Sequence, residues 1–146
     1  MKVSKRSGQG VVASSAVSLT ACVTTRKYRS GWVNLSPSGE KTLSKVAPQL
    51  ATMAAQNNEI DVIGNTDDVP IGPELAERYP SNWELAGARA AVVVRYLQAN
   101  GVDPTKLRAV SAGQYHPVDP ENSASDREKN RRTDLLLRPQ ARPGTQ

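Results

Sequence analysis

The chain has 146 residues, of which 38% are apolar, and its length fits a single domain of ordinary size. Three of its 19 basic residues lie in the first six positions, and without them 16 basic residues face 14 acidic ones, which excludes the charge footprint of a nucleic-acid-binding domain. One cysteine and one histidine exclude an internal disulfide, a cysteine-based zinc site and a multi-histidine centre within the chain, so we expect no metal and no cofactor.

The first 21 residues have the layout of a signal peptide: a basic start and then a short, rather polar stretch over residues 10–21, too short to span a bilayer. This stretch ends in Leu19-Thr20-Ala21-Cys22, which resembles the lipobox of bacterial lipoproteins. The resemblance implies that residues 1–21 are removed and that Cys22 carries the lipid, including palmitate. Val23 in place of Asp favours the outer membrane, with the rest of the chain facing the periplasm. The alternative is a disordered start with an incidental free thiol.

The next segment, residues 22–34, is polar and is predicted to be a tether, with a weak strand beginning at Trp32 and Val33. Ser36-Pro37 is a helix start, because serine caps helices and proline fits the first helical position. Apolar residues then follow at helical spacing: Leu43, Val46, Leu50 and Met53. Pro48 lies inside this pattern and is expected to kink the helix or split it.

Further along, a strand is predicted over residues 60–63, and a long loop over residues 65–80. Ser81 and Glu84 form a capping box that starts a helix over residues 82–100, ended by Gly101.

The remaining elements are a strand over residues 107–112, a helical turn over 126–130, a strand over 133–137 and a disordered tail over 140–146. The predicted order is thus strand, helix, strand, helix, strand, strand. This order predicts an α/β chain of the α+β sandwich type, a βαβαββ mixed sheet with its helices packed on one face.

Charged residues gather where the 60–63 strand ends and the next helix begins. Asp67 lies just past the strand, and Asn82 and Arg89 are two helical turns apart and share a face. A carboxylate, a guanidinium and a helix N-terminus in one pocket would suit a zwitterion, since the guanidinium can grip a carboxylate and the aspartate can accept from an ammonium. The alternative is a structural Asp–Arg ion pair that ties the loop to the helix.

Three ordered motifs carry a resemblance to a known family. They are Gly64-Asn65-Thr66-Asp67, then Asn82-x-x-Leu85-x-x-x-Arg89-Ala90, then Asn130-Arg131-Arg132. Over residues 35–139 the chain resembles the OmpA-like peptidoglycan-binding domain, and its 67–82 loop is similar to that of the MotB-like subgroup.

The resemblance implies non-covalent binding to the stem peptide of peptidoglycan through diaminopimelate. Asp67 and Arg89 match the principal ligand residues of the family, and Asn82, Leu85 and Thr66 match positions beside them. Asn130, Arg131 and Arg132 are expected to be supporting residues that hold the last strand near the site. The expected partners are peptidoglycan and a membrane reached by the lipid anchor, with no nucleic acid, and either an envelope complex or a second copy of the chain as a further partner.

Two other functions are possible interpretations of the same residues. A cell-wall hydrolase could use Asp67 and Asp68 as an acid and base, but adjacent loop residues rarely point at one bond, and no Gly-x-Ser-x-Gly motif is present. We therefore expect the chain not to be an enzyme. The same domain could instead anchor a stator-like or secretion-type envelope complex to the wall, and the sequence alone does not separate that role from a free-standing anchor.

Overall fold

Strand β3 (Asn58–Asn65) lies between two seven-residue strands of the sheet. The computed structural model describes residues 3–4, 17–19, 33–118 and 123–140. On one side β3 pairs in parallel with β4 (Leu107–Gly113), and on the other it pairs antiparallel with β5 (Thr133–Pro139). The sheet is therefore mixed, as the sequence predicted, and β3 is longer than the predicted four residues because its pairing with β5 begins at Asn58.

Two short strands complete the sheet in the order β1-β2-β5-β3-β4. They are β1 (Val3–Ser4) and β2 (Val17–Leu19), and β2 pairs antiparallel with β5. The strand expected at residues 32–33 is not found there: Val33 lies in no strand, and Trp32 is outside the described residues. Both short strands fall in the stretch with the signal-peptide layout, and removal of residues 1–21 stays a prediction. Cys22 also lies outside the described residues.

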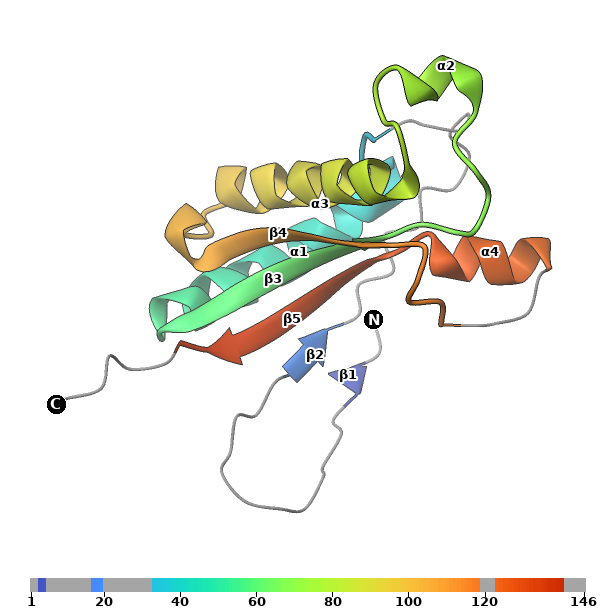
Figure 1. Cartoon of the computed structure of the whole chain (residues 1–146). Coiled ribbons are helices and arrows are strands. Elements are labelled where there is room, and N and C mark those ends of the chain that lie inside the picture. Colours follow the sequence, from blue (N-terminus) through green and yellow to red (C-terminus); the bar gives the residue numbers. More distant parts are fainter. Residues whose placement is uncertain (1–2, 5–16, 20–32, 119–122, 141–146) are drawn as a thin grey trace, which may run out of the picture.

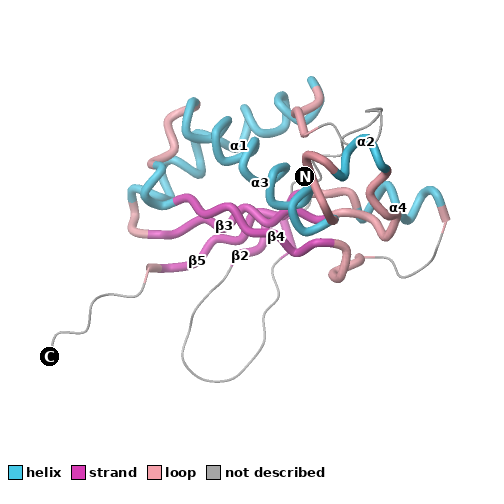
Figure 2. Tube along the Cα trace, turned by 45° about the horizontal axis from the view of Figure 1, so that its top comes forward, coloured by secondary structure: helices cyan, strands magenta, loops and turns pink. Residues whose placement is uncertain are grey.

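Helices α1 (Pro37–Ala55) and α3 (Asn82–Ala99) cover the same face of the sheet (Figures 1 and 2). The core lies between them and the sheet, and its fully buried side chains are mostly aliphatic, among them Leu43, Leu50, Ile60, Leu97 and Leu135. Burial of each such side chain stabilises the fold by roughly 1.5–3 kcal/mol, so this layer supplies the main driving force for folding.

The prediction that Pro48 splits the first helix is wrong. Helix α1 is assigned as a single element through Pro48, and Ser36 caps it by accepting the backbone N–H of Gly39 at 3.0 Å. Pro48 itself is exposed, whereas Val46, Ala47 and Leu50 around it are buried. Packing of these neighbours on the sheet outweighs the one backbone hydrogen bond that a proline removes.

The start of α3 follows the sequence prediction. The hydroxyl of Ser81 accepts the N–H of Trp83 at 3.2 Å, and the Glu84 carboxylate accepts the N–H of Ser81 at 2.9 Å. The helix ends before Gly101, whose φ of +94° is the left-handed conformation that glycine adopts without strain.

The connections contain more helix than was predicted. A short helix, α2 (Pro73–Ala76), lies in the loop between β3 and α3, where no helix was expected. Helix α4 (Ala124–Asn130) begins two residues before the predicted turn, because Ser123 and Asp126 make a second capping box. A 3-10 turn, η1 (Pro104–Lys106), leads into β4. Of the predicted tail only Gln140 is described, and its N–H donates to the carbonyl of Asn57 at 2.9 Å.

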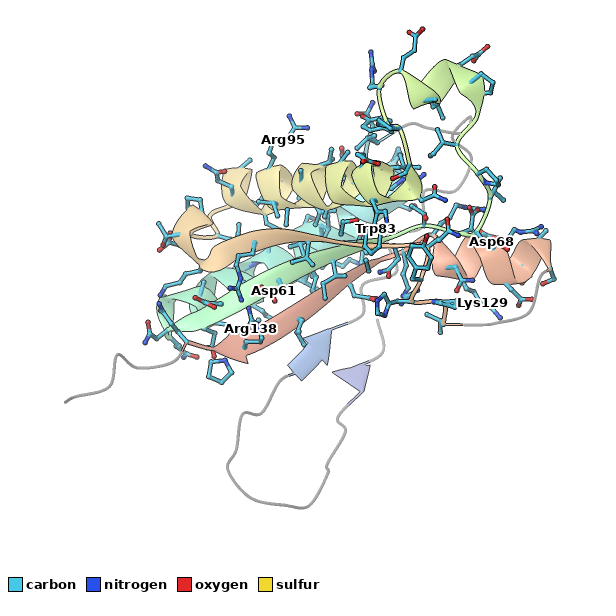
Figure 3. The ribbon with its side chains drawn as sticks, in the orientation of Figure 1. Asp61, Asp68, Trp83, Arg95, Lys129 and Arg138 are labelled. Atoms are coloured by element: carbon cyan, nitrogen blue, oxygen red, sulfur yellow. The ribbon has the colours of Figure 1, made fainter. Side chains whose placement is uncertain are left out.

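The face of the sheet away from the helices carries an ion network. Asp61 is 8% exposed and accepts Nε of Arg108 at 2.8 Å, while Nη2 of Arg138 lies 2.9 Å from its other oxygen (Figure 3). This network joins the neighbouring strands β3, β4 and β5, which explains why a charged residue such as Asp61 can occupy a central position of the sheet.

Candidate functional site

Three chain segments meet at the end of β3. The N–H of Asn65 donates to the carbonyl of Arg132 at 2.9 Å, and the N–H of Thr66 donates to the carbonyl of Gly113 at 2.9 Å. Because β3 and β4 run in parallel and β5 runs the other way, the residues after β3, after β4 and before β5 all lie at this end. The predicted wall-binding and supporting residues come from the segments after β3 and before β5 and from α3.

Asp67 is paired with Arg131. Nη1 of Arg131 lies 2.6 Å from Oδ2 of Asp67, and Oδ1 of Asp67 accepts the N–H of Val69 at 3.1 Å. The Asp67 side chain is only 12% exposed. The structural pair that we weighed between Asp67 and Arg89 is therefore not the pair that forms.

Thr66 and Asn82 support the loop that carries Asp67. Thr66 is buried, and its hydroxyl donates to the carbonyl of Asp67 at 2.9 Å. The amide of Asn82 donates to the carbonyl of Val69 at 3.1 Å and to Oε1 of Gln114 at 2.9 Å. Asn82 thus braces the loop after β3 against the loop after β4.

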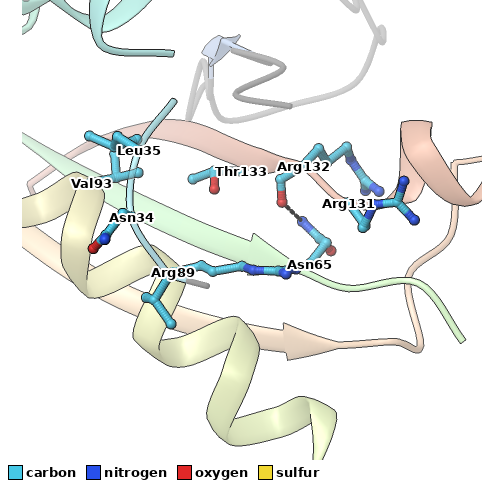
Figure 4. A pocket seen from close by; sticks show the side chains of 9 residues that line it. Asn34, Leu35, Asn65, Arg89, Val93, Arg131, Arg132 and Thr133 are labelled. Carbon is cyan, nitrogen blue, oxygen red and sulfur yellow. Dashed lines mark hydrogen bonds between the residues drawn. The ribbon is translucent and has the colours of Figure 1, made fainter. Parts of the chain in front are cut away.

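Arg89 lies in a different environment, in a pocket at the same end of the sheet (Figure 4). The described residues that line this pocket are Val33, Asn34, Leu35, Asn65, Arg89, Val93, Arg131, Arg132 and Thr133. They include three arginines and no acidic residue, so the pocket favours an anionic group. Thr66, Asp67, Asn82 and Leu85 are not among the lining residues, and Leu85 is buried with 5% exposure.

The guanidinium of Arg89 has an unsatisfied donor. Its Nε is buried and has no hydrogen-bond partner in the part of the chain that the structure describes. Burial lowers the pKa of Arg89; the charge of Asp67 opposes this effect and that of Arg131 adds to it. An arginine stays charged in a protein even so, and a buried donor without an acceptor is costly. This is the arrangement expected of a residue whose acceptor is supplied by a ligand.

The Asn-Arg-Arg motif divides into three roles. Asn130 is buried and its Oδ1 accepts the N–H of Val118 at 2.8 Å, so it holds a loop. Nε of Arg132 lies 3.2 Å from Asp134, and its Nη2 donates to the carbonyl of His116 at 3.0 Å. These bonds tie Asn130 and Arg132 to the loop after β4 and to β5, and their supporting role at the site stays a prediction. Arg131 does more, because it lines the pocket and holds Asp67.

Arg131 was predicted only as a supporting residue, and Gln114 was not predicted at all. Their positions beside predicted strands could have indicated both. Arg131 precedes a strand that was predicted beside β3, and Gln114 follows the other neighbouring strand. The strand directions, which decide that both lie at the end of β3, come from the pairing. Among the described residues no group of three or more His, Cys, Asp and Glu side chains could hold a metal ion.

Comparison with known proteins places this geometry in a family. The model of the OmpA family matches residues 28–131, which is most of the chain. The chain belongs to the OmpA family. The resemblance carried by the three motifs is thereby confirmed. The match covers the Asp67 loop and all pocket-lining residues except Arg132 and Thr133.

Relatives within the OmpA family agree with this assignment. The chain is 32% identical over 103 residues to outer membrane protein A of Bordetella avium, covering 70% of this chain and 48% of that one. It is 37% identical over 78 residues to motility protein B of Helicobacter pylori, covering 53% of this chain and 29% of the relative. The chain thus spans about half or less of the length of these curated relatives.

Solved structures extend the likeness to the fold. The periplasmic domain of Helicobacter pylori MotB (residues 90–256) superposes with a TM-score of 0.72 at 25% identity, over 91% of this chain and 78% of that one. The peptidoglycan-associated lipoprotein of Burkholderia pseudomallei superposes with a TM-score of 0.63 at 25% identity, over 82% and 88%. The α+β fold with its mixed sheet is therefore that of the OmpA family. None of the described helices has the length and apolar character needed to cross a bilayer.

Proposed function

We propose that the chain binds peptidoglycan non-covalently, through the diaminopimelate of its stem peptide. The observation that carries the proposal is Arg89: among the described residues its buried Nε has no partner, and those that line its pocket include two more arginines and no acid. Peptidoglycan binding is typical of the OmpA family, and a neighbouring structure is named a peptidoglycan-associated lipoprotein. A carboxylate of diaminopimelate is an anionic acceptor of the kind that this pocket lacks.

In this proposal different residues bind the carboxylate and the ammonium group of diaminopimelate. Arg89 grips the carboxylate through paired N–H donors, and Arg131, on the same pocket, adds positive charge. Asp67 accepts from the ammonium group of the same ligand, sharing its carboxylate with Arg131. Thr66, Asn82 and Leu85 keep the loop and the helix in position rather than lining the pocket.

Co-sedimentation with purified sacculi tests the proposal. Wild-type protein should pellet with sacculi, and Arg89→Ala protein should stay largely in the supernatant. Arg95→Ala is the matched control, because Arg95 lies on the same helix but is exposed and points away from the sheet (Figure 3). Equal pelleting of the wild type and a well-folded Arg89→Ala protein would refute the role of this pocket.

The same proposal includes a lipid anchor that attaches the chain to a membrane. The lipobox-like sequence before Cys22 supports an outer-membrane lipoprotein whose residues 22–34 tether the wall-binding domain in the periplasm. Several acyl chains hold a protein firmly on a membrane, whereas one holds it weakly. Cys22→Ala should therefore move the protein from the membrane fraction to the soluble fraction and abolish palmitate labelling. A wild type that is soluble in cells and unlabelled would disprove the anchor.

A second candidate is a wall-anchoring subunit of a larger envelope complex. The similarity to motility protein B and to the periplasmic domain of MotB supports this candidate, and the similarity covers 29% of motility protein B. Cross-linking in intact cells followed by purification separates the two. A defined complex or homodimer that persists in Arg89→Ala cells supports this candidate, whereas recovery of the monomer bound only to the wall supports the free-standing anchor.

A further inference from the structure

Two aromatic side chains form an exposed pair at the site end of the sheet. The ring centroids of Trp83 and Tyr115 are 5.2 Å apart with an interplanar angle of 35°. Trp83 is 48% exposed and Tyr115 is 61% exposed. The chain has six aromatic residues and no Phe. Two of these large side chains lie together on the surface instead of stabilising the core, which marks the pair as a candidate binding surface.

Contacts with β4 hold Trp83 of this pair in place. Gly113 has a φ of +59°, and a Cβ added to it would lie 3.1 Å from the ring of Trp83, so the indole packs directly over a glycine. The hydroxyl of Ser111 donates to the carbonyl of Trp83 at 2.7 Å. The indole therefore has one face fixed on β4 while nearly half of its surface stays open to solvent. A fixed aromatic ring loses little conformational entropy when it binds a partner.

The pair is also continuous with the proposed peptide site. One amide, that of Asn82, bonds both the carbonyl of Val69, two residues after Asp67, and the side chain of Gln114, next to Tyr115. Figure 3 labels Trp83 and Asp68 at the same end of the sheet. The aromatic pair and the Asp67 loop are thus two parts of one braced surface.

We propose that Trp83 and Tyr115 form a subsite for the sugar rings of the glycan strand to which the stem peptide is attached. This inference rests on the proposed function and names a second part of its ligand. A sugar ring has one face of C–H bonds, and these carry partial positive charge that suits the negative face of an aromatic ring. Neither Trp83 nor Tyr115 carries a charge, which fits a neutral sugar better than a charged peptide.

Calorimetry with two soluble ligands tests the subsite. One ligand is a stem tripeptide ending in diaminopimelate, and the other is the same tripeptide joined to its disaccharide. Wild-type protein should bind the second ligand about threefold to tenfold more tightly than the first. Tyr115→Ala should remove this difference and leave the affinity for the free tripeptide unchanged, while Tyr115→Phe should keep the difference because the ring remains.

Other outcomes overturn the proposal, and they differ from failure of the proposed function. Equal affinities of the wild type for both ligands would exclude a sugar subsite while leaving the peptide site intact. Loss of tripeptide binding in Tyr115→Ala would make Tyr115 part of the peptide site instead. Sedimentation velocity measures the oligomeric state as a further test. If Tyr115→Ala converts an oligomer to a monomer, Trp83 and Tyr115 form a protein interface and not a sugar subsite. Failure of the wild type to bind the free tripeptide would count against the proposed function itself.

Discussion

Arg131, and not Arg89, holds the carboxylate of Asp67: Nη1 of Arg131 lies 2.6 Å from Oδ2 of Asp67, although the two residues are 64 positions apart. Arg89 is left with a buried Nε that has no partner within the described residues. Arg131 already satisfies Asp67, whereas Nη1 of Arg132, in the same pocket as Arg89, is also buried without a partner among the described residues, so the unsatisfied groups at this end of the sheet are cations. An anionic group of the ligand would therefore supply the acceptor that these buried donors lack.

Arg89→Ala should weaken binding of a diaminopimelate-containing peptide about 10-fold or more, because a hydrogen bond to a charged group contributes about 1.5–3 kcal/mol. The melting temperature should stay the same or rise, because the substitution removes a buried donor without an acceptor. Arg89→Lys should restore little affinity, since an ammonium lacks the planar fork of a guanidinium. Calorimetry beside a thermal melt measures both. A lower melting temperature with unchanged affinity would assign Arg89 to stability instead.

Arg131→Ala should destabilise the free protein by about 1.5–3 kcal/mol, because it leaves the largely buried carboxylate of Asp67 without its charged partner. The neighbouring pair is the control. Asp68 and Arg127 are 3.1 Å apart, but their side chains are 53% and 37% exposed, so Arg127→Ala should cost about 1 kcal/mol or less. Urea unfolding measures the two differences. Equal losses in the two variants would mean that the partial burial of the Asp67–Arg131 pair has no energetic effect.

Gly64→Ala should destabilise the fold by about 1–3 kcal/mol or more, because the added Cβ would lie 2.0 Å from the carbonyl oxygen of Ala86 and would push α3 away from β3. Gly87→Ala is the matched substitution on the helix side. Its Cβ would meet nothing closer than Ser111 Cβ at 3.6 Å, and alanine is favoured over glycine inside a helix by about 0.5–1 kcal/mol. Thermal melts should therefore shift in opposite directions, and a stable Gly64→Ala protein would show that the contact between β3 and α3 can relax.

Glu84 should contribute a pH-dependent part of the stability. Its hydrogen bond with the Ser81 hydroxyl lowers the pKa of Glu84, so the charged form is favoured in the folded state. For a carboxylate with a lowered pKa, the added stability is present above the pKa of the unfolded state and is lost as the pH falls through the pKa of the folded state. Melting temperatures of the wild type and Glu84→Gln should thus differ most near neutral pH and converge in acid. A difference that is constant from about pH 7 to pH 3 would contradict this.

Local signals predicted most of the elements because their causes are local. The capping box of Ser81 and Glu84 and the glycine at position 101 set the ends of α3 as expected. The expected split of α1 at Pro48 is wrong, because that prediction considered one lost backbone hydrogen bond without the apolar packing around it. Helix α2 was missed because its four residues have no buried face and so leave no apolar periodicity in the sequence.

By itself, the sequence determined the family, the succession of helices and strands, and the identity of the charged residues at the end of β3. These follow from spacing along the chain, which motifs and periodicity record. Only the tertiary structure decided which arginine pairs with Asp67 and which keeps a buried Nε without a partner among the described residues. That choice depends on strand direction and register: β5 runs antiparallel to β3, so it brings Arg131 to the Asp67 carboxylate, whereas α3 leaves Arg89 in the neighbouring pocket. Competition between two guanidinium groups for one carboxylate is settled by distance in space, which separation in sequence does not report.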